Sequence, residues 1–191
     1  DMLFQSDGGC IMSAHLGNWE MILPMMGFNG LSMETVIKEQ TNSVANRFYI
    51  KMRTFPNIKL QWKKSALRNL YHAISEKKFI GLASDQSSKN RGVNINFFGI
   101  EAPFPKGTGI FYNRTGCNVF IVLSIMGSDF KYHLFSQKIK IDKNIPIPKP
   151  NYKYGSYKWK CINTMLKMEV GDSIRINNRT FASVKYTWVW R

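Results

Sequence analysis

The feature that most constrains the fold of this chain is a series of short apolar runs separated by segments with helical periodicity. Apolar runs fall at residues 10–14, 79–84 and 118–126, and two further strand candidates lie at residues 35–37 and 58–62. Apolar runs of this length without alternation are typical of strands that are buried on both faces. Because helical segments lie between them, the pattern predicts β-α-β units. We therefore expect an α/β fold with a central, largely parallel β-sheet flanked by helices.

The helical segments carry their own start and stop signals. Pro24 interrupts the apolar segment at 19–28, so this helix must be short, bent or late to start. Asn42 or Ser43 can cap the next helix, which continues to about Phe55 and repeats apolar residues near a period of 3.6. Further helices are expected at residues 65–78, 107–115 and 156–170, and a further strand at 132–141.

The length and charge of the chain limit its organisation and its partners. At 191 residues, with 44% hydrophobic and 20% charged residues, it is expected to form a single folded domain over residues 1–191. The formal net charge of +15 predicts an anionic partner, which can be a membrane surface, a phosphorylated lipid, a nucleic acid or an acidic protein. Nucleic acid is disfavoured because the Lys and Arg residues are dispersed and no nucleic-acid-binding motif occurs.

No motif in the sequence predicts a metal or a cofactor. The three cysteines, Cys10, Cys117 and Cys161, have no metal-like spacing, and the three histidines are scattered. No run approaches the 18 apolar residues or so that a membrane-spanning helix needs. We therefore expect neither a bound metal nor a cofactor.

The segment SAHLGNWE at residues 13–20 contains the best candidates for catalysis. His15 follows the first predicted strand, and Asn18 is a good N-cap for the helix in which Glu20 stands in the first turn. A neutral imidazole can accept a proton from a hydroxyl, and a carboxylate on its other nitrogen would orient it. Glu20 can provide that carboxylate only if the chain bends between the two residues. The alternative is a buried, hydrogen-bonded histidine followed by a helix-capping glutamate.

Asp85 follows the predicted strand at 79–84, just as His15 follows the strand at 10–14. If the two strands are parallel, both residues lie at the same edge of the sheet, where open α/β sheets bind ligands. The alternative for Asp85 is a turn or cap residue.

Several segments resemble one protein family in the same order along the chain. After SAHLGNWE come Arg53, Asp85-Gln86, Phe97-Phe98-Gly99, Gly107, Thr115-Gly116 and a terminal TWVWR. These segments are similar to those of the bacterial lipid A late acyltransferases, the lauroyl/myristoyl transferases of the lysophospholipid acyltransferase superfamily. The chain departs from the family pattern at Pro103-Phe104-Pro105 and at Trp190, where the family commonly has histidine.

The resemblance implies a role for each matching residue. It makes His15 the general base and Glu20 its orienting partner, and it assigns Arg53 to a phosphate group or the acyl donor. Phe97 and Phe98 would line a pocket for the acyl chain, although packing in the core is the default for such residues. The substrate-binding residues expected on this basis are Asn18, Arg53, Asp85, Gln86, Phe97, Phe98 and Gly107.

The activity implied by the resemblance is transfer of a fatty acyl chain from an acyl carrier protein thioester to a hydroxyl of a lipid A precursor. Coenzyme A as donor, and another glycolipid or a lysophospholipid as acceptor, remain alternatives. An alternative of another class is a non-catalytic basic module that binds an anionic membrane or nucleic acid. The expected partners of the enzyme are acyl carrier protein, a phosphorylated glycolipid and an anionic membrane surface.

The resemblance also predicts a location. Members of the family carry an N-terminal membrane anchor ahead of the catalytic strand, whereas this sequence opens DMLFQSDGG and reaches that strand at once. We therefore expect a fragment without its N-terminal anchor region. The intact protein is expected at the cytoplasmic face of the bacterial inner membrane, either peripheral or anchored.

Overall fold

The computed structural model describes residues 2–63, 65–97, 99–141, 175–176 and 179–180. The helix expected at 156–170, the terminal TWVWR motif and Phe98 lie outside the described residues. All the strands that the sequence predicts fall within the described ranges.

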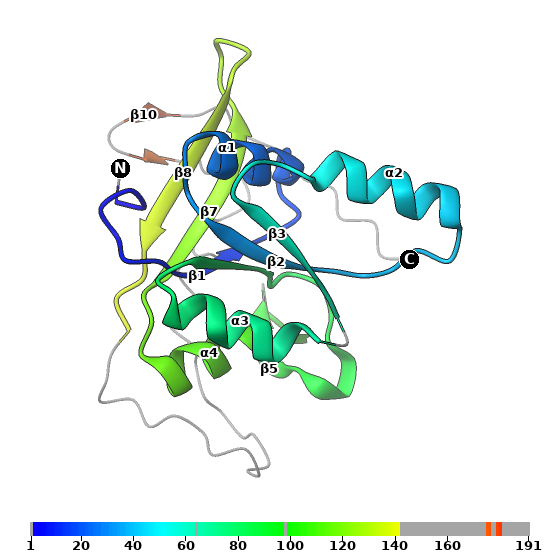
Figure 1. Ribbon diagram of the computed structural model, residues 1–191. Helices are drawn as coiled ribbons and strands as arrows, with labels where there is room; N and C mark the ends of the chain where they lie inside the picture. The colour runs from blue at the N-terminus through cyan, green and yellow to red at the C-terminus, as the bar shows by residue number, and fades with distance from the viewer. Residues whose placement is uncertain (1, 64, 98, 142–174, 177–178, 181–191) are drawn as a thin grey trace.

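The centre of the structure is a six-stranded sheet in the order β3-β2-β4-β1-β7-β8 (Figure 1). Neighbouring strands are parallel except β7 and β8, which form an antiparallel pair. The α/β fold with a largely parallel sheet is thereby confirmed. The strands are β1 (Gly9–Ser13), β2 (Met33–Ile37), β3 (Ile58–Trp62), β4 (Phe79–Ala83), β7 (Val119–Met126) and β8 (Tyr132–Lys138).

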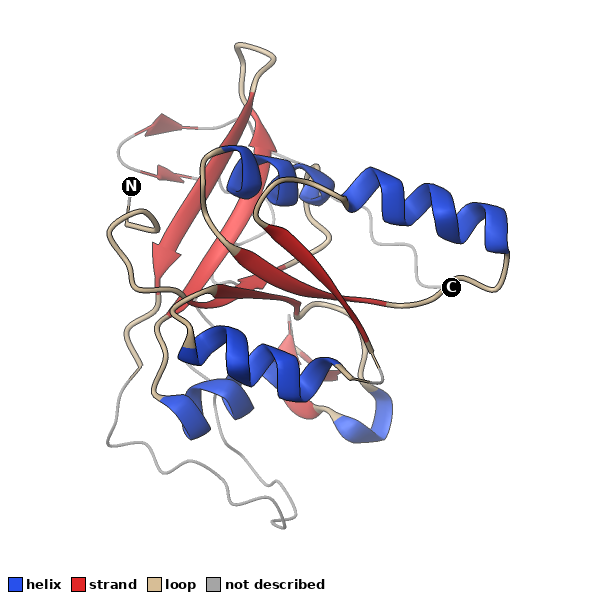
Figure 2. Cartoon of the chain, in the orientation of Figure 1, coloured by secondary structure: helices blue, strands red, loops and turns tan. Residues whose placement is uncertain are grey.

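Helices cover both faces of this sheet (Figures 1 and 2). Helix α1 (Ile22–Phe28) lies on one face, and α3 (Ala66–Ser75) and α4 (Gly107–Thr115) lie on the other. Helix α2 (Ser43–Arg53) extends away from the sheet, and none of its residues is buried. The connection between β2 and β3 therefore contains a helix that contributes no buried residue to the core.

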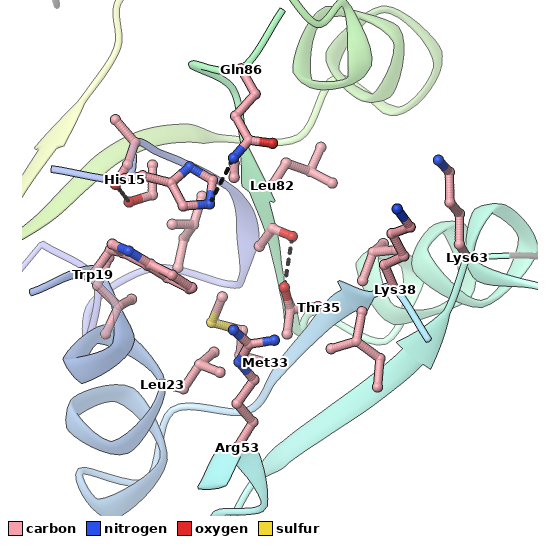
Figure 3. Close-up of a pocket in the computed structure, with 18 of the residues that line it drawn as sticks. His15, Trp19, Leu23, Met33, Thr35, Lys38, Arg53, Lys63, Leu82 and Gln86 are labelled. Atoms are coloured by element: carbon pink, nitrogen blue, oxygen red, sulfur yellow. Dashed lines mark hydrogen bonds between the residues drawn. The ribbon is translucent and has the colours of Figure 1, made fainter. Parts of the chain in front are cut away.

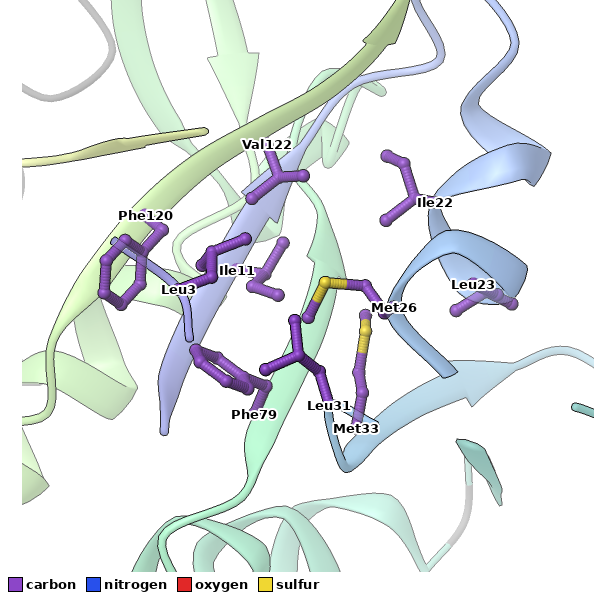
Figure 4. Packing of buried hydrophobic residues seen from close by; sticks show 10 residues of the cluster. All are labelled: Leu3, Ile11, Ile22, Leu23, Met26, Leu31, Met33, Phe79, Phe120 and Val122. Atoms are coloured by element: carbon purple, nitrogen blue, oxygen red, sulfur yellow. The ribbon is translucent and has the colours of Figure 1, made fainter. Parts of the chain in front are cut away.

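The two faces of the sheet form separate hydrophobic clusters because successive strand residues point in opposite directions. Ile11, Phe79 and Phe120 pack with α1 (Figure 4). Their sequence neighbours Cys10, Ile80 and Val119 pack with α3 and α4. All but the last residue of β1 and of β7, and the first three residues of β4, are buried on both faces, as their apolar runs in the sequence indicate.

Pro24 and Asn42 act as their positions in the sequence predict. A short 3₁₀ turn, η1 (Trp19–Met21), precedes α1, so Pro24 falls in the first turn of the α-helix, where its missing N–H has no intrahelical role. The side chain of Asn42 accepts hydrogen bonds from the backbone N–H groups of Val44 and Ala45, and so caps α2.

The segment from Ser87 to Lys106, in which the sequence predicts no helix or strand, contains a β-hairpin. After a 3₁₀ turn, η2 (Lys89–Arg91), the antiparallel strands β5 (Val93–Phe97) and β6 (Ile100–Phe104) pair with each other. Val93 and Ile95 are buried with Phe104, while the alternate residues of β5 face outward. This alternation of apolar and polar residues is the signal of a half-buried strand. Two further short strands are β9 (Arg175–Ile176) and β10 (Arg179–Thr180).

Candidate active site

A tight turn after β1 carries the imidazole of His15 out of the sheet. Gly17 within this turn has a φ of 64°, in the left-handed region that favours glycine. A Cβ at Gly17 would clash with the carbonyl oxygen of Ser124 in β7, and the next residue, Asn18, donates its backbone N–H to that same oxygen. The HLGN sequence therefore fixes the turn by laying its backbone directly against β7.

Asp85 holds His15 by two hydrogen bonds. The backbone N–H of His15 donates to Oδ2 of Asp85 at 2.8 Å, and the imidazole Nδ1 lies 2.8 Å from Oδ1. The parallel strands β1 and β4 pair Ser13 with Ala83, so both chains leave the same edge of the sheet side by side. The prediction that the two strand ends meet at one edge is confirmed.

Glu20 does not contact the imidazole, which corrects the expected orientation of His15 by Glu20. Its carboxylate instead accepts two hydrogen bonds from Arg53, one from Nε to Oε2 at 3.0 Å and one from the terminal nitrogen to Oε1. The physical reason is that η1 begins directly after the turn, and Trp19, the residue before Glu20, occupies the space beside the imidazole. The Trp19 ring packs edge-on against the His15 ring, with centroids 4.7 Å apart.

Arg53 is fixed by its surroundings as well as by Glu20. Its guanidinium lies over the rings of Trp19 and Tyr49, 5.3 and 5.4 Å from their centroids. The hydrogen bond from Arg53 to the Glu20 carboxylate raises the pKa of the guanidinium above its usual value. The cation is therefore permanent and held in one orientation, with Trp19 between it and His15.

A cavity of about 480 Å³ opens beside His15 (Figure 3). Its volume lies within the range of about 300–1,000 Å³ typical of small-molecule sites. Most of its wall is apolar, and His15 and Gln86 lie together at one end in Figure 3. The apolar wall consists of Ile11, Ala14, Trp19, Ile22, Leu23, Met33, Val36, Ile37, Leu82 and Ala83.

Three cations, Arg53, Lys38 and Lys63, also line the cavity. Reasoning from the sequence identified only Arg53 and missed the two lysines. Lys38 comes directly after β2 and Lys63 directly after β3, so they stand at the same carboxyl edge as His15 and Asp85. The strand-end rule that placed His15 and Asp85 together would have found both lysines if it had been applied to every parallel strand.

Of the other predicted site residues, some line this cavity and some do not. Gln86 lines it, and its Nε2 atom lies 3.5 Å from Nε2 of His15. Asn18 is the N-cap of η1 but makes no capping hydrogen bond with its side chain. Phe97 packs against Phe104 in the hairpin, with ring centroids 5.5 Å apart. Gly107 begins α4 and lies next to the side chain of Leu82, which is part of the cavity wall. Neither Phe97 nor Gly107 is itself part of the cavity lining.

Comparison with known protein families identifies the relatives of this chain. Residues 1–139 match the family described as bacterial lipid A biosynthesis acyltransferase. The chain belongs to this family. A comparison with curated proteins found no match. Family membership implies an acyltransferase that works in lipid A biosynthesis.

Two structural findings bear on how this lipid A acyltransferase family member can work. Across the described ranges, no three His, Cys, Asp or Glu side chains are grouped so that they could hold a metal ion. None of the helices in those ranges is both long and apolar enough to cross a bilayer. What the described site does offer is an oriented imidazole, an apolar cavity and three cations.

Proposed function

We propose that this protein transfers a fatty acyl chain from a thioester to a hydroxyl group of a lipid A precursor, with His15 as the general base. The observation that carries the proposal is the contact of His15 with Asp85 at the end of an apolar cavity. An imidazole that is oriented by a carboxylate and lines a largely apolar cavity is suited to activating a hydroxyl beside an acyl chain.

Contact with Asp85 favours the ring tautomer that this role needs. Nδ1–H donates to Asp85, so Nε2 carries the lone pair and can accept the proton of the substrate hydroxyl. The alkoxide oxygen then forms a bond to the thioester carbonyl carbon, and the carbonyl oxygen takes the negative charge. When the C–S bond breaks, the imidazolium returns the proton to the departing sulfur. Gln86, whose amide lies beside Nε2, is placed to donate to the oxyanion or the acceptor.

The apolar wall and the cations of the cavity would bind different parts of the two substrates. The apolar wall, including Leu23, Met33 and Leu82, would bind the acyl chain and remove it from water. Lys38, Lys63 and Arg53 would bind the phosphates of the acceptor. Glu20 occupies one edge of the guanidinium, so Arg53 would use its remaining N–H groups for this contact. In this arrangement Glu20 is a positioning residue, because it orients Arg53.

The strong positive charge of the chain supports an anionic donor and the proposed location. Acyl carrier protein is an acidic protein, so a net charge of +15 favours its approach, as it also favours the approach of the anionic coenzyme A. The same charge favours binding at the anionic cytoplasmic face of the inner membrane. Coenzyme A is the alternative donor, and another glycolipid or a lysophospholipid is the alternative acceptor.

The decisive experiment measures acyl transfer with the whole protein and His15→Ala. Acyl carrier protein loaded with a fatty acid and a phosphorylated lipid A precursor serve as substrates, and mass spectrometry detects the acylated product. We expect His15→Ala to lose a factor of about 10²–10⁴ in turnover, as loss of a general base does. His72→Ala, which removes an exposed imidazole on α3, is the matched control and should leave turnover unchanged. Undiminished turnover in His15→Ala would refute the mechanism.

A further inference from the structure

Helix α2 exposes a continuous apolar face. Val44, Phe48 and Met52 follow one another at intervals of four residues, so they line one side of the helix. Their exposed fractions are 65%, 60% and 49%, and no residue of the helix is buried. A surface helix normally directs such residues into a core. Helix α2 instead extends away from the sheet (Figure 1), and no described residue buries these side chains.

The charges of α2 indicate what kind of surface could cover this face. The helix carries Arg47, Lys51 and Arg53 and has no acidic residue. Arg47 and Lys51 are exposed, so they are free to meet an anionic partner beside the apolar face. A helix with an apolar face, an aromatic residue and several cations is the kind that lies in the interface of an anionic bilayer.

The position of α2 relative to the cavity favours a bilayer over other anionic partners. Arg53, the last residue of the helix, lines the cavity, and Tyr49, one turn earlier, packs against its guanidinium. A bilayer that accepted the apolar face of α2 would therefore lie next to a cavity with an apolar wall and a cationic rim. A lipid could then move between the leaflet and the cavity with little exposure to water.

We infer that α2 is the element by which this protein docks on an anionic membrane. Val44, Phe48 and Met52 enter the boundary between headgroups and acyl chains, while Arg47 and Lys51 bind lipid phosphates. The inference rests on the lipid-directed function proposed above, but vesicle binding involves no turnover. The two proposals can therefore fail separately.

The test measures binding of the whole protein to vesicles of phosphatidylcholine with and without phosphatidylglycerol. We expect binding that depends on phosphatidylglycerol and weakens with salt. Phe48→Ser/Met52→Ser should weaken it by a factor of about 10–100, since each side chain transfers apolar surface from water. Arg47→Gln/Lys51→Gln should weaken it by a factor of about 10 on anionic vesicles only.

Leu67→Ser is the matched control, because Leu67 is 57% exposed on another helix, α3. This variant should bind like the wild type. The inference is overturned if Phe48→Ser/Met52→Ser binds as well as the wild type, or if Leu67→Ser loses as much. Light scattering without vesicles tests whether a second copy of the chain covers the apolar face of α2 instead. A dimer that dissociates in Phe48→Ser/Met52→Ser while vesicle binding persists would assign this face to self-association and overturn membrane docking.

Discussion

Nδ1 of His15 lies 2.8 Å from Oδ1 of Asp85, although 70 residues separate the two in the sequence. The contact follows from the topology, because β1 and β4 are adjacent parallel strands that end at the same edge of the sheet. The backbone N–H of His15 donates to the same carboxylate, so Asp85 fixes the start of the turn as well as the ring. Orientation of the base therefore depends on the pairing of two strands.

We predict that Asp85→Asn lowers kcat by a factor of about 10²–10⁴, because the neutral amide stabilises the imidazolium less than a carboxylate does. Steady-state kinetics with a saturating acyl donor measures the change. Glu20→Gln is the informative comparison, since Glu20 does not contact the ring. If Glu20→Gln lowered kcat as far as Asp85→Asn and left KM unchanged, the assignment of Asp85 as the orienting residue would be wrong.

A separate prediction concerns the pair formed by Arg53 and Glu20. Arg53→Lys keeps the charge but removes the planar fork that binds Glu20 and lies over Trp19. We expect KM for the phosphorylated acceptor to rise by a factor of about 10, with a smaller effect on kcat. Glu20→Gln should change KM in the same direction, because it releases the guanidinium. Arg68→Lys, a change on α3 outside the cavity lining, provides the control for loss of a guanidinium.

The turn after β1 gives a prediction about stability. Gly17→Ala places a Cβ against the Ser124 carbonyl and forces an alanine into a left-handed conformation. We expect a loss of about 1–3 kcal/mol in the free energy of unfolding, measured by urea denaturation. Gly116→Ala also meets a positive φ but has open space around it, and it should cost less. Equal losses would mean that contact with β7 contributes nothing.

The sequence predicted the sheet and the meeting of His15 with Asp85 because both depend on local patterns and one topological rule. Apolar runs located the strands, and parallel pairing placed their ends together. The same reasoning chose the wrong carboxylate as the partner of His15. A spacing of five residues between His15 and Glu20 does not determine how the intervening turn folds. Trp19 packs against both the His15 ring and the guanidinium of Arg53, and Arg53, which lies 33 residues beyond Glu20, binds the Glu20 carboxylate.

Two other features of the structure could not be predicted from the sequence, for physical reasons. The periodicity of Val44, Phe48 and Met52 indicates an apolar helix face, but whether a core covers it depends on where the chain carries the helix. In the hairpin, β5 alternates between buried and exposed residues over only five residues. Strand β6 does not alternate, and it contains Pro103, where proline argues against pairing. Such short signals are decided by tertiary contacts.

We predict that Lys38 and Lys63 act together on phosphorylated substrates. Lys38→Gln/Lys63→Gln should raise KM for the acceptor by a factor of about 10–30 at low salt, and the difference should shrink as ionic strength increases. Lys77→Gln/Lys78→Gln is the matched control for the loss of two charges, because both lysines precede β4 and therefore lie at the opposite edge of the sheet from the cavity. If both variants raised KM equally, net charge alone would explain the effect.

The last prediction concerns alkaline pH and Cys10. Burial raises the pKa of its thiol from 9.0 to about 12 in the folded protein. Above pH 9 the unfolded chain therefore loses a proton that the folded chain retains, and stability falls as pH rises from about 9 to about 12. The contribution of this group changes by up to about 1.4 kcal/mol per pH unit across that window. Cys10→Ala removes this ionisable thiol. The free energy of unfolding, measured by urea titrations, should therefore decline less steeply with pH in this variant. Parallel slopes in the two proteins would show that the Cys10 thiol ionises as readily in the folded chain as in the unfolded one.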